Sequence, residues 1–196
     1  MENKAWYKEM SVYQIWCRSF CDGNGAGIGD LWGVLSKLDY IKSLGVDGIW
    51  FSPLYPSPNA DYGYDISDYK SIQPDFGDLD IFRQVLEGAH ERGMRVFMDL
   101  VINHTSDEHP WFTESKKGPG NPYRDYYFWR KGRGRHRPPN NWDSLFEGRA
   151  WEYDRASDEW YLHIFSKKQP DLNMDNPRVR EEVKDIMRFW LDMGVD

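Results

Sequence analysis

One pattern recurs along the chain: an amphipathic helical segment ends at a glycine, and a short apolar run follows within a few residues. The glycines are Gly45, Gly93 and Gly194, and the first two precede the runs Val46–Phe51 and Arg95–Ile102. A glycine after the last turn is a common helix stop, and an apolar run without helical spacing is typical of a buried parallel strand covered on both faces. Helices that alternate with such strands predict a parallel α/β sheet with right-handed crossovers.

The remaining elements extend this pattern. Val12–Trp16 is expected to form the first strand, and Asp78 is a good N-cap for the helix that stops at Gly93. Asn176 followed by Pro177 predicts the start of the last helix, because proline is favoured at the first helical position. The predicted inner faces of the three helical segments consist of Leu31, Leu35, Leu38 and Ile41; Phe82, Val85, Leu86 and Ala89; and Val179, Val183, Ile186 and Trp190.

Long irregular loops follow the strands, whereas the joints after helices are tight. This asymmetry predicts the N-terminal part of a (β/α)8 TIM barrel, with about three βα units and an inserted irregular subdomain after the third strand. A doubly wound sheet is the alternative, but no Gly-x-Gly-x-x-Gly turn follows any strand. The predicted segments are 1–104 (barrel strands and helices), 105–175 (insert) and 176–196 (third barrel helix). The motif at Gly194 predicts that a fourth strand follows in a longer protein.

Composition narrows the class of partner. The net charge of -7 argues against nucleic acid, and the basic cluster Arg130–Arg137 is interpreted as a solvated loop. No apolar run is long enough to span a bilayer, and Met1–Trp16 contains no signal-peptide core, so the protein is expected to be cytoplasmic. Cys17 and Cys21 are predicted to be free thiols, and no zinc-ligand spacing is present. The ten Trp and twelve Tyr supply flat rings suited to sugar faces, although core packing explains most of them.

Polar side chains interrupt and end the third predicted strand. Asp99 lies inside the apolar run, and Asn103 and His104 follow it. Polar groups at such positions must be paired or take part in function, because leaving them buried without partners is costly. The C-terminal ends of barrel strands are where active sites form, so the sequence predicts a site here.

Three motifs carry a resemblance to a known family. Asp99-Leu-Val-Ile-Asn-His104 resembles the first conserved region of the α-amylase superfamily of glycoside hydrolases, family 13, at the end of the third barrel strand. Gln169-Pro-Asp-Leu-Asn173 is similar to the motif near the end of the insert in the oligo-1,6-glucosidase and α-glucosidase branch. Asp61-Tyr-Gly-Tyr-Asp65 resembles the loop after strand two that binds the non-reducing terminal glucose.

The resemblance implies a substrate-binding role for several residues. His104 would hydrogen-bond the 6-hydroxyl of the sugar at the cleaved bond, Tyr64 would stack on its ring, and Asp61 would bind hydroxyls at its far edge. Phe165 and Gln169 would line the same pocket from the insert. The expected partner is therefore a small oligosaccharide, with no nucleic acid and no membrane.

The resemblance also implies a glycosidase activity and predicts that the catalytic carboxylates lie outside this chain. Retaining glycosidases need two carboxyl groups about 5 Å apart, and the family carries them after strands four and five, beyond Asp196. Asp99 is predicted to belong to the substrate-binding residues, because it would order a conserved arginine and the site around it, and it is not one of that pair. This chain is therefore expected to hold no catalytic residue and to be inactive alone. The implied function is cleavage of terminal α-glucosidic bonds in short oligosaccharides. The alternatives are a sucrose, trehalose or maltose isomerase or transglucosidase on the same fold, and, more remotely, a non-catalytic transporter-associated homologue.

The loop Asp22–Asp30 repeats the first nine positions of a calcium-binding loop. Position five is Ala26, which offers no side-chain oxygen, and position twelve is Gly33 where a bidentate glutamate is usual. Two alternatives therefore stay open, a weak structural site for Ca²⁺ or Mg²⁺ and a metal-free polar turn. The ligands of a bound ion would be Asp22, Asn24, the Ile28 carbonyl and Asp30.

Overall fold

The computed structural model describes residues 5–134 and 136–196. Residues 1–4 of the N-terminal segment and Arg135 of the basic cluster lie outside the described residues. The chain divides into two compact units, which are described separately. The first comprises the described residues up to Leu54 together with Lys70–Leu100 and Arg188–Asp196, and the second comprises Tyr55–Tyr69 and Val101–Met187.

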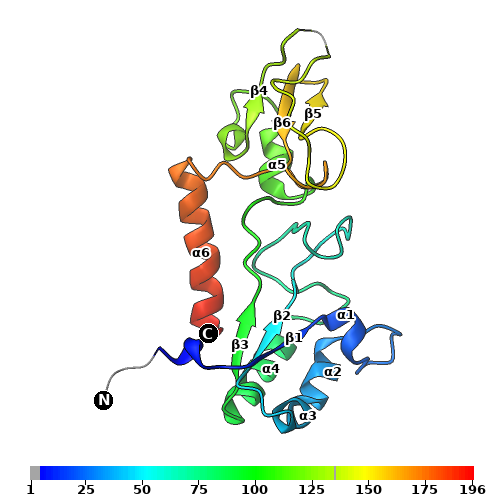
Figure 1. Cartoon of the computed structure of the whole chain (residues 1–196), viewed down its shortest axis with the longest axis vertical. Helices are drawn as coiled ribbons and strands as arrows, with labels where there is room; N and C mark the ends of the chain where they lie inside the picture. The colour runs from blue at the N-terminus through cyan, green and yellow to red at the C-terminus, as the bar shows by residue number, and fades with distance from the viewer. Residues whose placement is uncertain (1–4, 135) are drawn as a thin grey trace. The chain divides into compact units, whose positions relative to one another are not determined.

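The first unit contains a parallel sheet, as predicted. Its strands are β1 (Val12–Ile15), β2 (Gly48–Phe51) and β3 (Arg95–Met98), which lie side by side in that order (Figure 1). Ile49 and Phe51 are fully buried, whereas Trp50 between them is 39% exposed. The prediction that both faces are covered is therefore wrong at Trp50, because successive side chains of a strand point to opposite faces and only the face of Ile49 and Phe51 is fully buried here.

The helices of this unit follow the predicted stripes with one break. They are η1 (Trp6–Lys8), α1 (Cys17–Phe20), α2 (Leu31–Ser36), α3 (Leu38–Ser43) and α4 (Leu79–Glu91). One continuous helix was predicted where α2 and α3 lie, but Lys37 separates them because its N–H bonds to the Val34 carbonyl in a tightened last turn. The predicted N-cap of α4 is confirmed, since Asp78 accepts hydrogen bonds from the Asp80 and Ile81 N–H groups.

The third strand is shorter than the apolar run that predicted it. It ends at Met98, and Leu100 is 39% exposed, so the run to Ile102 is not a continuous buried strand. β3 is an edge strand of this sheet. The Asp196 N–H donates to the Val96 carbonyl at 3.0 Å, and the Asp196 carboxylate accepts from the Val96 N–H at 2.9 Å.

The second unit contains an antiparallel sheet with strand order β4-β6-β5. Its elements are α5 (Pro110–Ser115), η2 (Arg124–Tyr126), β4 (Trp129–Arg130), β5 (Trp151–Asp154) and β6 (Glu159–Leu162). The sequence predicted only loops and short strands here, and α5 was missed although His109 caps it and Pro110 occupies its first turn. The core around Phe112 is aromatic, with Tyr127, Trp129 and Tyr161 in contact.

The last helix, α6 (Pro177–Met193), begins at the predicted proline. Val179 and Val183 are buried in the second unit, and Trp190 packs on Phe82 in the first. The predicted insert 105–175 lies within the second unit, which also takes in Tyr55–Tyr69. Among the described residues, none of the helices combines the length and apolarity needed to cross a membrane.

Candidate functional site

A cluster of polar side chains surrounds His104 in the second unit. Two distant segments pair here in antiparallel fashion, because His104 forms a bridge with Asp171 and the Thr105 N–H donates to the Pro170 carbonyl at 3.2 Å. The Leu172 N–H donates to the Asn103 carbonyl at 2.8 Å. This pairing places Gln169 beside His104, so two of the motifs quoted above meet in space.

The His104 imidazole is held in one orientation. Its ring is 4% exposed, and Nε2 lies 3.1 Å from the Tyr64 carbonyl oxygen. A carbonyl can only accept, so the proton belongs on Nε2, and Nδ1 then accepts from the Asn103 amide at 3.2 Å. Burial lowers the pKa of His104. The ring is therefore neutral at pH 7 and presents a fixed donor and acceptor.

Gln169 connects His104 to Asp61. Its Nε2 donates to Asp61 Oδ2 at 2.8 Å, and its Oε1 accepts from the Ser166 N–H at 3.0 Å, which fixes the orientation of the amide. Gln169 Nε2 also lies 3.1 Å from His104 Nε2. Because both nitrogens carry protons in this arrangement, we interpret that approach as a packing contact. Asp61, Gln169 and His104 therefore form one continuous polar wall.

The loop that carries Asp61 is organised by Asp65. This fully buried carboxylate accepts hydrogen bonds from the Ser57 hydroxyl at 2.8 Å and from the Ala60 and Asp61 N–H groups, each at 2.9 Å. Tyr62 in the same loop has a positive φ of 50°, a backbone conformation that costs energy for a non-glycine residue. Asp65 ends the motif that begins at Asp61, and its role in positioning this loop was not predicted.

Aromatic rings border the polar wall. Phe165 meets His104 edge to face at 5.2 Å between ring centroids, and Phe146 meets Phe165 at 5.7 Å. Phe146 is 55% exposed, so its ring is available to a ligand. Phe146 was not predicted, because no motif marks it and its exposure is a tertiary property. Tyr64 contributes its carbonyl oxygen to the site and is itself partly buried.

A buried carboxylate lies behind His104. Asp171 Oδ1 accepts from the Ile164 N–H at 3.0 Å and from Asn103 Nδ2 at 3.3 Å. Burial raises the pKa of Asp171 to about 6. Asn103 therefore bridges this carboxylate and the imidazole of His104, which makes Asp171 a second missed positioning residue. Its place inside the motif Gln169–Asn173 was the signal that pointed to it.

Asp99 belongs to the first unit, unlike the other five predicted substrate-binding residues. Its Oδ1 accepts from the Trp50 indole N–H at 2.5 Å, and its own N–H donates to the Phe51 carbonyl at 3.3 Å. The carboxylate at the end of β3 thus has a structural partner on the neighbouring strand. Its predicted part in the substrate pocket stays a prediction.

The Asp22 and Asp30 carboxylates of the predicted metal loop already accept hydrogen bonds from nearby backbone N–H groups. Asp22 accepts from the N–H groups of Gly25, Ala26 and Gly27 at 2.6 to 3.2 Å. Asp30 is fully buried and accepts from three backbone N–H groups, including Gly33 at 2.6 Å, where it caps α2. In the described part of the chain, no group of three or more His, Cys, Asp or Glu side chains is placed to hold a metal. These oxygens could bind a divalent ion only through the lone pairs that do not accept hydrogen bonds, so the residues fit such an ion weakly.

The chain has parallel strands joined by helical crossovers, and an inserted unit with its own sheet carries the polar site. These two features are typical of a (β/α) barrel enzyme domain with long loops on its active face. The model of the α-amylase catalytic domain matches residues 14–196, so the chain belongs to the α-amylase family.

Several proteins of this family are similar to the chain. An oligo-1,6-glucosidase of Parageobacillus thermoglucosidasius is 60% identical over 193 residues, which cover 98% of this chain and 34% of that protein. An α-glucosidase of Schizosaccharomyces pombe is 54% identical over 195 residues, which cover 97% of this chain and 34% of that protein. Among solved structures, isomaltulose synthase from Erwinia rhapontici has a TM-score of 0.94 at 53% identity, and trehalose-6-phosphate hydrolase from Bacillus licheniformis has 0.96 at 49%. Both structural matches cover 97% of this chain and 34% of the other, so the chain spans about a third of the relatives' length.

Proposed function

We propose that the full-length enzyme, meaning a polypeptide of the relatives' length that contains this sequence, cleaves terminal α-glucosidic bonds of short oligosaccharides with retention of configuration. The observation that carries the proposal is the polar wall of Asp61, Gln169 and His104 beside Phe165. The similarity to oligo-1,6-glucosidases and α-glucosidases supports the same activity.

The wall suits a neutral glucose unit. Asp61 is partly exposed, and a carboxylate has lone pairs beyond the one that accepts from Gln169, so it can bind sugar hydroxyls. The His104 ring is neutral and so does not attract a charged group. Its Nε2–H, which donates to the Tyr64 carbonyl, is proposed to be shared with the 6-hydroxyl of the bound sugar. The rings of Phe165 and Phe146 cover C–H faces, and the Tyr64 ring is proposed to stack on the sugar.

The bond-breaking groups are proposed to lie outside this chain. A retaining mechanism needs a nucleophilic carboxylate and an acid/base carboxyl group about 5 Å apart. By the resemblance they follow the fourth and fifth strands, beyond Asp196. The two carboxylates of this chain that were predicted to bind substrate have other partners, since Asp61 bonds to Gln169 and Asp99 bonds to Trp50. The chain's part in the reaction is to bind and orient the terminal sugar, which supplies binding energy and position.

The test uses the full-length enzyme with isomaltose and p-nitrophenyl α-glucoside. We expect glucose to be released first as the α-anomer, as followed by NMR. Asp61→Asn removes the charged acceptor and should lower kcat/KM at least tenfold, since hydrogen bonds to charged groups contribute about 1.5 to 3 kcal/mol. Asp175→Asn, which changes an exposed carboxylate of the same unit, is the matched control and should have no effect. No turnover of any α-glucoside, or a β-anomer as first product, would overturn the proposal.

A second candidate is an isomerase or transglucosidase on sucrose, trehalose or maltose. The specific observation in its favour is the similarity to isomaltulose synthase, at 53% identity. The two activities differ in whether water or a sugar hydroxyl accepts the glucosyl group. Chromatography of the products from sucrose decides between them, because a rearranged disaccharide in excess over free glucose favours the isomerase.

Two further assignments remain proposals. We propose that the loop Asp22–Asp30 binds Ca²⁺ or Mg²⁺ weakly through Asp22, Asn24, the Ile28 carbonyl and Asp30, where the ion would add stability and take no part in catalysis. We also propose a cytoplasmic location, which the free thiols of Cys17 and Cys21 support.

A further inference from the structure

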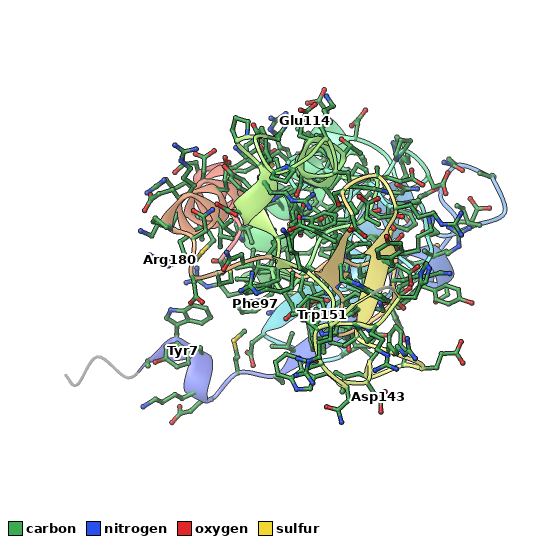
Figure 2. The ribbon with its side chains drawn as sticks, turned by 90° about the horizontal axis from the view of Figure 1, so that it is seen from above. Tyr7, Phe97, Glu114, Asp143, Trp151 and Arg180 are labelled. Carbon is green, nitrogen blue, oxygen red and sulfur yellow. The ribbon has the colours of Figure 1, made fainter. Side chains whose placement is uncertain are left out.

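A pocket on the β5 and β6 side of the second unit adjoins the polar wall, with which it shares the bordering ring of Phe146. It has a volume of about 700 Å³, within the range of small-molecule sites, and all its lining residues belong to this unit. Its aromatic lining consists of Phe146, Trp151, Tyr153 and Trp160. Figure 2 labels Trp151, which lies on the yellow segment of the ribbon together with the labelled Asp143. Neither His104 nor Asp61 lines this pocket.

His163 lines the pocket and carries a buried acceptor that has no hydrogen-bond partner among the described residues. Its ring is 4% exposed, and Nδ1 lies 3.0 Å from the Phe165 carbonyl oxygen, which assigns the proton to Nδ1. Nε2 is then a lone-pair acceptor, and no described residue donates to it. The charges that act on this ring are Glu152 and Lys167, both of which line the pocket. A buried acceptor without a donor is costly and calls for an N–H or O–H group.

The charges around the pocket balance. Glu147 and Glu152 are opposed by Arg149 and Lys167, so the lining has no net charge when His163 is neutral. Burial lowers the pKa of His163, which keeps the ring neutral at pH 7. A pocket with balanced acceptors and donors above aromatic rings suits a ligand that is neutral, rich in hydroxyls and apolar on its faces.

We propose that this pocket is a second carbohydrate-binding site, in which one sugar hydroxyl donates to His163 Nε2 and the sugar face packs on the aromatic lining. The bound unit would hold a longer or neighbouring oligosaccharide near the enzyme and would not be cleaved. Only the choice of an α-glucoside as probe rests on the proposed function; the site itself rests on the acceptor, the charge balance and the rings.

The test is an NMR titration of the full-length enzyme labelled with ¹⁵N-histidine. The probe is the sulfur-linked analogue of isomaltose, which resists hydrolysis. We expect the His163 Nε2 signal, assigned by its loss in His163→Asn, to shift as its lone pair accepts an O–H. The His104 signal reports the proposed active-site pocket, and exposed His136 is the internal control. A shift of His104 without any shift of His163 overturns this proposal and leaves the proposed function intact.

Calorimetry of the same probe gives the second measurement. Two binding events are expected in the parent protein and one in His163→Asn, whose amide can still donate to the Phe165 carbonyl but lacks the Nε2 acceptor. Circular dichroism checks that the variant is folded. If it is not, Glu147→Gln and Lys167→Gln, two exposed positions of the rim, replace it and should each weaken the second event at least threefold. A single event in the parent protein that is unchanged in His163→Asn overturns the proposal.

Discussion

Among single residues, the pair His104 and Asp171 best shows how burial sets chemistry. Both are buried, and Asn103 lies between them with its amide in contact with each. Burial disfavours the charged form of either group, so it lowers the pKa of the imidazole and raises that of the carboxyl. The result is a neutral imidazole whose orientation is set by its neighbours. A sugar hydroxyl needs such a fixed, uncharged partner.

Asp171 makes stability depend on pH. Its folded pKa of about 6 lies above the ordinary value of 3.8, so the folded state binds the proton more tightly than the unfolded chain. The contribution of Asp171 to the free energy of unfolding is fully present below about pH 4. It is lost as the pH rises through about 6, and the total loss is roughly 3 kcal/mol at most.

Asp171→Asn tests this dependence. Both hydrogen bonds go to Oδ1, which the asparagine retains, so the packing should be preserved. We expect the variant to gain stability relative to the parent between pH 4 and pH 7, measured by urea unfolding of the full-length enzyme at several pH values. A constant difference between the two proteins across this range would contradict the assignment.

Among elements, the loop Asp22–Asp30 combines two tasks. Asp30 caps α2 and also accepts N–H groups from Gly23 and Asn24, so one carboxylate fastens the loop to the helix. Gly33 is required where it stands, because a Cβ there would lie 1.9 Å from the Cys21 carbonyl oxygen. Hydrogen bonds and close backbone packing therefore already fix the conformation of the loop. A bound cation would stabilise that conformation further.

This loop should bind a cation weakly, and a substitution that adds an oxygen ligand should raise its affinity. We expect millimolar Ca²⁺ to raise the Tm of the full-length enzyme by a small amount and EDTA to reverse it, because a ligand at ten times its Kd stabilises by about 1.4 kcal/mol. Ala26→Asp restores an oxygen at position five, and Ala26 is exposed, so the response to Ca²⁺ should grow. Ala60→Asp is the matched control, since Ala60 is an exposed alanine outside this loop. Equal melting curves with Ca²⁺ and with EDTA, in the parent and in Ala26→Asp, would favour the metal-free turn.

At the scale of the whole molecule, the chain is a set of βα units with a self-contained insert. The first unit is built on the parallel sheet, and the second has its own aromatic core and carries the His104 cluster. The chain corresponds to about a third of the length of its relatives. Its fold is that of the N-terminal part of an α-amylase-type barrel.

Residues 1–196 expressed alone should be inactive and poorly soluble. The face of the sheet that carries Trp50 is exposed in the first unit, and β3 is an edge strand, both of which favour association. Gel filtration and an α-glucosidase assay, with the full-length enzyme as control, check this expectation. A monomeric, cooperatively melting and active 1–196 protein would show that the reactive carboxylates are in this chain after all.

The amino-acid sequence by itself determined the parallel strands, the helix ends at Gly45 and Gly93, the cap at Asp78 and the start of α6 at Pro177. These features depend on local backbone preferences and on the spacing of apolar residues, which are readable in one dimension. Its motifs also indicated Asp61, His104 and Gln169 as residues of one site.

Tertiary structure alone decided the rest. The pairing of 103–105 with 170–172, the roles of Asp65 and Asp171, the exposed ring of Phe146 and the unsatisfied nitrogen of His163 all depend on neighbours distant in the chain. So does the alternation that buries one face of the sheet and exposes Trp50. Burial and hydrogen bonding are set by what packs around a residue, and no local pattern records them.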